Sequence, residues 1–323
     1  MKAVFLDYAS IDAGDLDRSA LAAAATHWEW HDATDARDIL SRIRGADIVV
    51  SNKVPLDREI LQQAPDLKLI CIAATGTDKI DLRAASELGI QVSNVVGYAT
   101  PAVVQHVFAS LLALTTSLIP YYGEVRSGAW QAQGNFCLLN HPISELSGKT
   151  LGILGFGELG QAVAKVAECF GMKVLIANRP GSERALPDRL SLQELLPRVD
   201  VLSLHIPLAD NTRGLIGAEE LALMKTGAFL INTSRGGIVD EVALAGSLRS
   251  GHLGGAAMDV LSQEPPPDDN PLLATDIPNL ILTPHTAWAS VEARQRLLEE
   301  IAANIQAFRK GLARNCVNCE ESS

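Results

Sequence analysis

The stretch TLGILGFGELGQAVAKVAECFGM (residues 150–172) decides the fold class of this chain. Its apolar beginning predicts a short buried strand, and its Ala- and Val-rich continuation predicts a helix. Gly155, Gly157 and Gly160 stand between them in G-x-G-x-x-G spacing. The first glycine permits a tight turn, the second lets a pyrophosphate approach the backbone, and the third lets helix and strand pack closely. A bare glycine motif is also compatible with a flexible turn, but the flanking strand and helix favour a dinucleotide site.

The next predicted strand, KVLIANR (173–179), ends without the acid that reads the ribose of NAD in this kind of fold. Asn178 takes that place and Arg179 follows it. A neutral amide does not repel a 2′-phosphate, and a guanidinium forms charge-assisted hydrogen bonds with one. We therefore expect NADP(H) to be favoured, with Arg179 and Arg184 near the phosphate. The alternative is a solvated arginine beside a site that also accepts NAD(H).

Strand-like and helix-like runs alternate along the whole chain, which is typical of parallel sheets covered by helices. Six strands from 150 to 285 indicate a complete dinucleotide-binding domain, which we expect at 100–288. Strands at 2–8, 46–52, 67–73 and 90–95 indicate a smaller α/β domain. A last helix capped at Ser290 is expected to pack onto this smaller domain, which would then comprise 1–99 and 289–323. The predicted fold class is α/β with two doubly wound parallel-sheet domains, a Rossmann domain inserted into a flavodoxin-like one.

Composition excludes several kinds of partner. The 323 residues carry 27 Lys and Arg against 38 Asp and Glu, with no basic stripe, so nucleic acid is not an expected partner. No apolar run is long enough for a membrane span, and we expect a cytoplasmic protein. Cys316 and Cys319 form a lone C-x-x-C, for which a pair of free thiols is the favoured interpretation over metal or redox use. We expect no metal site.

Three polar residues follow predicted strands of the larger domain: Arg235, Glu264 and His285. Ligands of doubly wound sheets lie beyond the carboxyl ends of the strands, so these side chains are expected to converge there. Singly, each has a structural interpretation as a surface charge, a loop acid or a core histidine. Together they supply what reduction of a 2-oxo acid needs. A guanidinium can bind the substrate carboxylate through two hydrogen bonds, an imidazole can donate a proton, and a side-chain carboxylate can orient that imidazole.

The segments GILGFGELG (152–160), NTSRGGIVDE (232–241), MDVLSQEPP (258–266) and LTPHTAW (282–288) occur together in this order. In this the chain resembles the D-isomer-specific 2-hydroxyacid dehydrogenases over nearly its whole length. The resemblance implies that Arg235 binds the substrate, Glu264 pairs with the histidine and His285 donates the proton. It also implies a homodimer and a glycine loop in the smaller, substrate domain that holds the substrate carboxylate; AATGTDKID (73–81) matches this loop and points to Thr75 and Gly76.

The same resemblance places Asp259 at the nicotinamide carboxamide, with Thr233 and Ser234 lining its pocket. The predicted cofactor residues are Gly155, Gly157, Glu158, Leu159, Gly160, Asn178, Arg179, His205, Pro207, Thr233, Ser234 and Asp259. The segments 97–114 and 283–290 look most like the glycerate dehydrogenase or hydroxypyruvate reductase branch, in which Trp288 would narrow the pocket for hydroxypyruvate or glyoxylate. The alternatives are another substrate such as D-lactate, or a dinucleotide-sensing protein similar to a corepressor of the same fold.

Overall fold

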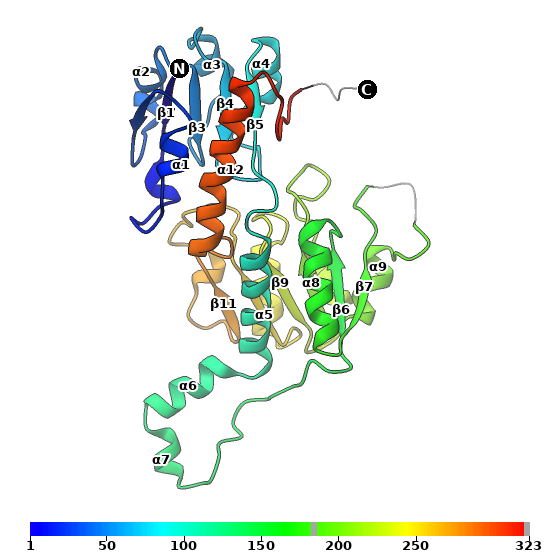
Figure 1. The fold of residues 1–323 in the computed structure, drawn as a ribbon. Coiled ribbons are helices and arrows are strands. Elements are labelled where there is room, and N and C mark those ends of the chain that lie inside the picture. The colour runs from blue at the N-terminus through cyan, green and yellow to red at the C-terminus, as the bar shows by residue number, and fades with distance from the viewer. Residues whose placement is uncertain (182–185, 320–323) are drawn as a thin grey trace. The chain divides into compact units, whose positions relative to one another are not determined.

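The chain divides into two compact units, each with its own parallel sheet (Figure 1). The computed structural model describes residues 1–181 and 186–319. The first unit comprises 1–99 and 288–323, and the second comprises 100–287. The chain returns to the first unit at Trp288, one residue earlier than the boundary drawn from the sequence.

The sheet of the first unit has five parallel strands in the order β2-β1-β3-β4-β5. The strands are β1 (Lys2–Phe5), β2 (His27–Trp30), β3 (Ile48–Ser51), β4 (Leu69–Ile72) and β5 (Gln91–Ser93). This is the order of flavodoxin-like sheets. The edge strand β2 was not among the strands expected from the sequence. Its four residues, HWEW, are all at least partly exposed, so they lack the apolar run that marked the buried strands.

The core of the first unit forms where strand side chains meet the surrounding helices. Val4, Val49 and Ile70 of the sheet are fully buried. The long helix α12 (Val291–Arg309) begins at Ser290, whose hydroxyl accepts a hydrogen bond from Ala293 N, and packs on β4 and α1. The shorter helices are α1 (Ser19–Ala22), α2 (Ile39–Ile43), α3 (Arg58–Gln62) and α4 (Leu82–Glu87). Through these contacts α12 forms part of the first unit.

The segment after α12 lies along the edge of β5. Cys316 forms an antiparallel bridge with Ser93, and Val317 N donates to Val92 O. Cys316 and Cys319 form a disulfide with a Cα–Cα distance of 5.7 Å. The interpretation of these residues as free thiols is therefore wrong. The chain turns between them, and this Cα–Cα distance lies in the range that disulfide-bonded cysteines have.

The second unit contains a six-stranded parallel sheet in the order β11-β10-β9-β8-β6-β7. The strands are β6 (Thr150–Leu154), β7 (Lys173–Ile176), β8 (Val201–Leu204), β9 (Phe229–Asn232), β10 (Gly255–Met258) and β11 (Leu280–Leu282). Beyond β7, Leu190 forms a parallel bridge with Ala177. If this single bridge is counted as a vestigial third strand, the order becomes 3-2-1-4-5-6-7. The first six of these positions are those of a Rossmann domain, and β11 adds a seventh strand.

Helices cover this sheet, and one segment extends away from it. The helices are α5 (Thr100–Thr115), α8 (Glu158–Cys169), α9 (Leu192–Leu195), α10 (Ala218–Leu223) and α11 (Glu241–Arg249), and α5 packs against α8, β9 and β10. The extended segment carries α6 (Leu118–Arg126) and α7 (Ala129–Gln133), and we call residues 118–143 the arm (Figure 1). In the described residues, no helix alone is long and apolar enough to cross a membrane. Taken together, α5 and α6 have the necessary length and apolar composition, but the two helices meet at a bend of 62°.

Candidate active site

The glycine loop between β6 and α8 leaves room for a ligand at one glycine and none at the other two. Gly155 has φ +99°, and a Cβ there would lie 2.3 Å from His205 O. A Cβ on Gly160 would lie 2.1 Å from Gly155 O. At Gly157, by contrast, a Cβ would have no heavy atom of the described residues within 4 Å. The first and third glycines therefore serve close packing, and the open backbone at Gly157 fits the pyrophosphate of a dinucleotide.

The first turn of α8 begins directly after this loop. Glu158 is exposed, and its Oε1 accepts a hydrogen bond from Thr100 Oγ1 at 2.6 Å; Leu159 is half-buried. The Glu158 carboxylate would repel a phosphate, so the groups at this helix end that suit a phosphate are the backbone N–H groups.

Two strand ends beside the loop carry buried polar atoms for which the described part of the chain offers no hydrogen-bond partner: Thr233 Oγ1 and His205 Nδ1. His205 Nε2 lies 2.9 Å from Ser203 Oγ, and burial lowers the pKa of His205 to about 4, so the ring is neutral. Buried polar atoms normally have partners. These two orphaned atoms therefore suit a cofactor that supplies the missing hydrogen bonds. The residue after Ile206, Pro207, is exposed, and its carbonyl accepts from Thr212.

The end of β7 carries Asn178 and Arg179. Asn178 N donates to Leu190 O, and Asn178 Oδ1 accepts from Leu186 N at 3.4 Å. The side chain of Arg179 is exposed. A second cation that the sequence did not single out, Arg189, lies with its Cζ 6.0 Å from the ring centroid of Phe156, inside the glycine loop. Arg184 lies outside the described residues.

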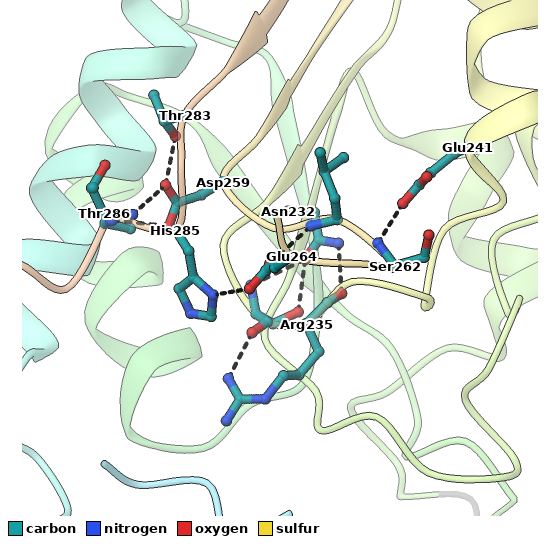
Figure 2. Close-up of polar contacts among 12 residues, drawn as sticks. Asn232, Arg235, Glu241, Asp259, Ser262, Glu264, Thr283, His285 and Thr286 are labelled. Atoms are coloured by element: carbon teal, nitrogen blue, oxygen red, sulfur yellow. Dashed lines mark hydrogen bonds and ion pairs between the residues drawn. The ribbon is translucent and has the colours of Figure 1, made fainter. Parts of the chain in front are cut away.

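Three neighbouring strands, β9, β10 and β11, bring the predicted catalytic residues to one edge of the sheet (Figure 2). His285 Nδ1 and Glu264 Oε2 are 2.6 Å apart, and their side chains are 25% and 36% exposed. Arg235 follows β9, and its Nη1 donates to Ser234 O at 2.8 Å. A histidine with its carboxylate partner and a guanidinium therefore follow three adjacent strands, and their catalytic roles stay predictions.

His285 is held in an unusual backbone conformation by Asp259. Its backbone angle φ is +56°, a value that residues other than glycine rarely adopt. Its N–H donates to Asp259 O. The buried Asp259 carboxylate accepts from Thr283 Oγ1 and from the N–H groups of Thr286 and Ala287 (Figure 2). Asp259 was predicted from the resemblance to bind the carboxamide. That role stays a prediction, and the hydrogen bonds show that its side chain anchors the turn that carries His285.

Two buried side chains of the site were missed from the sequence. Asn232 Oδ1 accepts from Ser234 N and Oγ, and Asn232 Nδ2 donates to Arg235 O, so it shapes the turn before the guanidinium. Glu241 accepts from Ser262 N and Asn270 Nδ2, which holds the loop leading to Glu264. The signal available in the sequence was that Asn232 and Glu241 are the first and last residues of the motif 232–241. Polar side chains are uncommon at buried positions, so the burial of these two residues indicates a specific role.

Apart from Arg235, the predicted substrate residues belong to the first unit. Thr75 is exposed and its Oγ1 donates to Val95 O at 2.7 Å, and Gly76 is half-buried beside it. Trp288 packs edge-on against Tyr98, with ring centroids 6.2 Å apart. Thr75 and Gly76 come shortly after β4, which ends at Ile72, so they lie in the loop at the carboxyl end of a parallel strand, where ligands of such sheets bind.

A doubly wound sheet with this glycine loop, and with a His–Glu pair and an arginine at its strand ends, is typical of a dinucleotide-dependent dehydrogenase. The profile of the D-isomer specific 2-hydroxyacid dehydrogenase, NAD binding domain, matches residues 108–287. The chain belongs to the family of D-isomer-specific 2-hydroxyacid dehydrogenases. It is thus an oxidoreductase that acts on CH–OH donors and uses a nicotinamide dinucleotide.

Similar proteins match the chain over nearly its whole length. A glycerate dehydrogenase from Methylorubrum extorquens is 45% identical over 98% of both chains. A hydroxypyruvate reductase from Blautia hydrogenotrophica is 38% identical over 98% of this chain and 100% of its own. Among solved structures, an acyclic imino acid reductase in complex with NADPH and D-Arg has a TM-score of 0.85, with 29% identity over 98% and 100% of the two chains. D-lactate dehydrogenase from Aquifex aeolicus, complexed with NAD and lactic acid, has a TM-score of 0.83, with 29% identity over 99% and 100%.

Proposed function

We propose that this enzyme reduces a small 2-oxo acid to the 2-hydroxy acid, with His285 as the proton donor. The observation that carries the proposal is the 2.6 Å contact between His285 Nδ1 and Glu264 Oε2. With Nδ1 bound to a carboxylate, Nε2 on the opposite side of the ring is the atom that gives its proton to the forming alkoxide oxygen. The Glu264 carboxylate keeps the ring oriented and stabilises its charged form.

Arg235 has the complementary role of binding the acid. One nitrogen of its guanidinium is held by Ser234 O, which fixes the direction of the planar group. The remaining N–H groups would form paired hydrogen bonds with the substrate carboxylate and polarise the carbonyl. The nicotinamide, when bound, supplies the hydride. Gly157, Thr233 and His205 are the residues whose open backbone and orphaned atoms suit that cofactor.

The substrate we favour is hydroxypyruvate or glyoxylate. The similar proteins include a glycerate dehydrogenase and a hydroxypyruvate reductase. We infer that backbone N–H groups at Thr75 and Gly76 hold the carboxylate and that the indole of Trp288 limits the size of the substrate side chain. A panel of 2-oxo acids, followed through nicotinamide absorbance, tests this proposal. Faster turnover of phenylpyruvate than of hydroxypyruvate would contradict it, and no turnover of any 2-oxo acid would favour a dinucleotide sensor.

NADPH is the cofactor we propose as preferred. Asn178 presents no negative charge, and both Arg179 and Arg189 stand near the glycine loop or the strand end beside it. Two cations and a neutral amide suit a 2′-phosphate. Catalytic efficiency measured with NADPH and with NADH tests the proposal, and a clear preference for NADH would remove it.

We also propose that the protein is a homodimer formed through the arm. Large apolar side chains are exposed along it: Leu118, Ile119, Tyr122, Val125, Trp130, Phe136, Leu139 and Ile143. Phe136 is 95% and Leu139 is 81% exposed. An apolar patch of this kind marks an interaction site, and a second copy would cover it. In sedimentation, Phe136→Ser/Leu139→Ser should shift the protein to monomer, while Leu223→Ser, an exposed site outside the arm, should not. A wild-type monomer would refute this.

A cytoplasmic location stays a prediction from the sequence.

A further inference from the structure

A buried polar network in the first unit centres on Asn304 of α12. Asn304 is 1% exposed, and within the described residues its side chain hydrogen-bonds to groups that lie outside α12. Its Nδ2 donates to Asn94 O at 2.8 Å. Its Oδ1 accepts from Arg314 Nη1 at 2.8 Å and from Asn315 Nδ2 at 3.1 Å. Asn304 therefore joins the end of β5 to the segment that follows the last helix.

The same network continues to the loop at Thr75. Asn94 Nδ2 donates to Thr75 O at 2.8 Å, and Thr75 Oγ1 donates to Val95 O at 2.7 Å. Val95 N in turn donates to Ala74 O. Three hydrogen bonds thus fix residues 74–75 to residues 94–95, and Asn304 holds the carbonyl of Asn94. The carboxyl-terminal segment adds a further restraint, because Asn315 O accepts from Asn94 N.

The chemistry of Asn304 suits this position because it needs a donor and an acceptor on one short side chain. An aspartate would keep the acceptor for Arg314 and Asn315 but would place a second oxygen against Asn94 O. A leucine would remove the side-chain donor to the carbonyl of buried Asn94 and the acceptor for the half-buried Arg314 and Asn315, and proteins avoid leaving buried polar groups unpaired. Neither replacement changes the residues of the second unit, which carry the dinucleotide loop and His285.

We propose that Asn304 is a positioning residue for substrate binding: through Asn94 it sets the backbone of the Thr75–Gly76 loop. The inference rests on the proposed function, in which that loop holds the substrate carboxylate. Asn304 itself does not contact the substrate in this account. Its loss should weaken binding of the 2-oxo acid in the ground and transition states alike, so KM rises while kcat changes little.

The test compares Asn304→Asp with Leu297→Ala. Leu297 is a fully buried residue of the same helix, and its truncation destabilises the first unit without removing a hydrogen bond of the network. For Asn304→Asp we expect KM for hydroxypyruvate to rise at least about tenfold, the scale of one hydrogen bond to a charged group. KM for NADPH and kcat should change little. Leu297→Ala should lower Tm and leave KM for hydroxypyruvate unchanged.

A milder variant covers the case in which Asn304→Asp does not fold. Asn315 has φ +50°, so Asn315→Gly keeps the backbone conformation and removes one donor to Asn304. We expect KM for hydroxypyruvate to rise roughly threefold, the scale of one neutral hydrogen bond. Unchanged KM in the variants that fold, or an equal rise in Leu297→Ala, overturns the inference.

Gly76→Ala separates this failure from a failure of the proposed function. The added methyl group would intrude on a carboxylate held by the loop, so KM for hydroxypyruvate should rise in this variant. If it rises while the Asn304 and Asn315 variants bind normally, only the positioning role is wrong. If Gly76→Ala also binds hydroxypyruvate normally, the loop is not the carboxylate site, and the inference falls with it.

Discussion

Replacing Glu264 by glutamine removes a charge from beside His285 and leaves the shape of the side chain nearly unchanged. The amide oxygen of the variant still accepts a hydrogen bond from Nδ1. The change therefore isolates the electrostatic contribution of the carboxylate to a ring that must be positively charged before it donates its proton.

The magnitude follows from the geometry of the pair. A charged imidazole and carboxylate in contact, with centres about 4 Å apart, attract each other by about 1 kcal/mol in water and about 4 kcal/mol at an effective dielectric constant near 20. The side chains are 25% and 36% exposed, which places the pair between these limits. Taking about 2 kcal/mol, we expect the rate of reduction to fall roughly 30-fold, since each 1.4 kcal/mol is worth about a factor of ten.

The assay is the pre-steady-state loss of nicotinamide absorbance with saturating 2-oxo acid over a range of pH. In Glu264→Gln the rate of this absorbance change should fall by the factor worked out above. Asp268→Asn removes an exposed acid from the same loop and is the matched control. A Glu264→Gln rate within about threefold of wild type, well short of the worked value, would refute the reasoning. An equal loss in Asp268→Asn would refute it too.

Three further predictions concern the cofactor, stability and thiols. Arg179→Ala should lower catalytic efficiency with NADPH by about 10- to 100-fold and spare NADH, and an equal loss with both would contradict a phosphate contact. Burial lowers the pKa of His205 from 6.5 to about 4, so the unfolded chain binds a proton in this range that the folded chain does not. The contribution of His205 to the free energy of unfolding should therefore be fully present above pH 6.5 and be lost as the pH falls toward 4. Calorimetry should show a weaker loss of stability over this range in His205→Asn. Cys316 and Cys319 should resist alkylation until a dithiol is added, whereas Cys71, whose pKa is raised by burial, should resist until the protein unfolds.

Local patterns predicted the parts of the fold that depend on neighbouring residues. The strand, turn and helix around Gly155 are encoded in one continuous stretch, and the helix after Ser290 has its cap and apolar face in sequence. The edge strand β2 was missed because an exposed edge needs no apolar run. The third strand of the Rossmann order could not be expected either, since it is reduced to one bridge at Leu190.

The site divides in the same way. His285, Glu264 and Arg235 were predictable because each follows a strand and has reactive chemistry. Asn232 and Asn304 have no such mark, and their importance comes from partners that only the folded chain brings near. The disulfide was misjudged because a C-x-x-C pattern does not reveal whether the backbone turns between its cysteines.

The division of the first unit between both ends of the chain has a consequence for its synthesis on the ribosome. Residues 1–99 emerge first, but α12, which packs on β4 and α1, comes only after 100–287 have been made. At about 5–20 residues per second, the nascent first unit waits roughly ten to forty seconds for its last helix. The unit begun second is thus the first that can be completed, and the surface later covered by α12 is open to chaperones in the meantime.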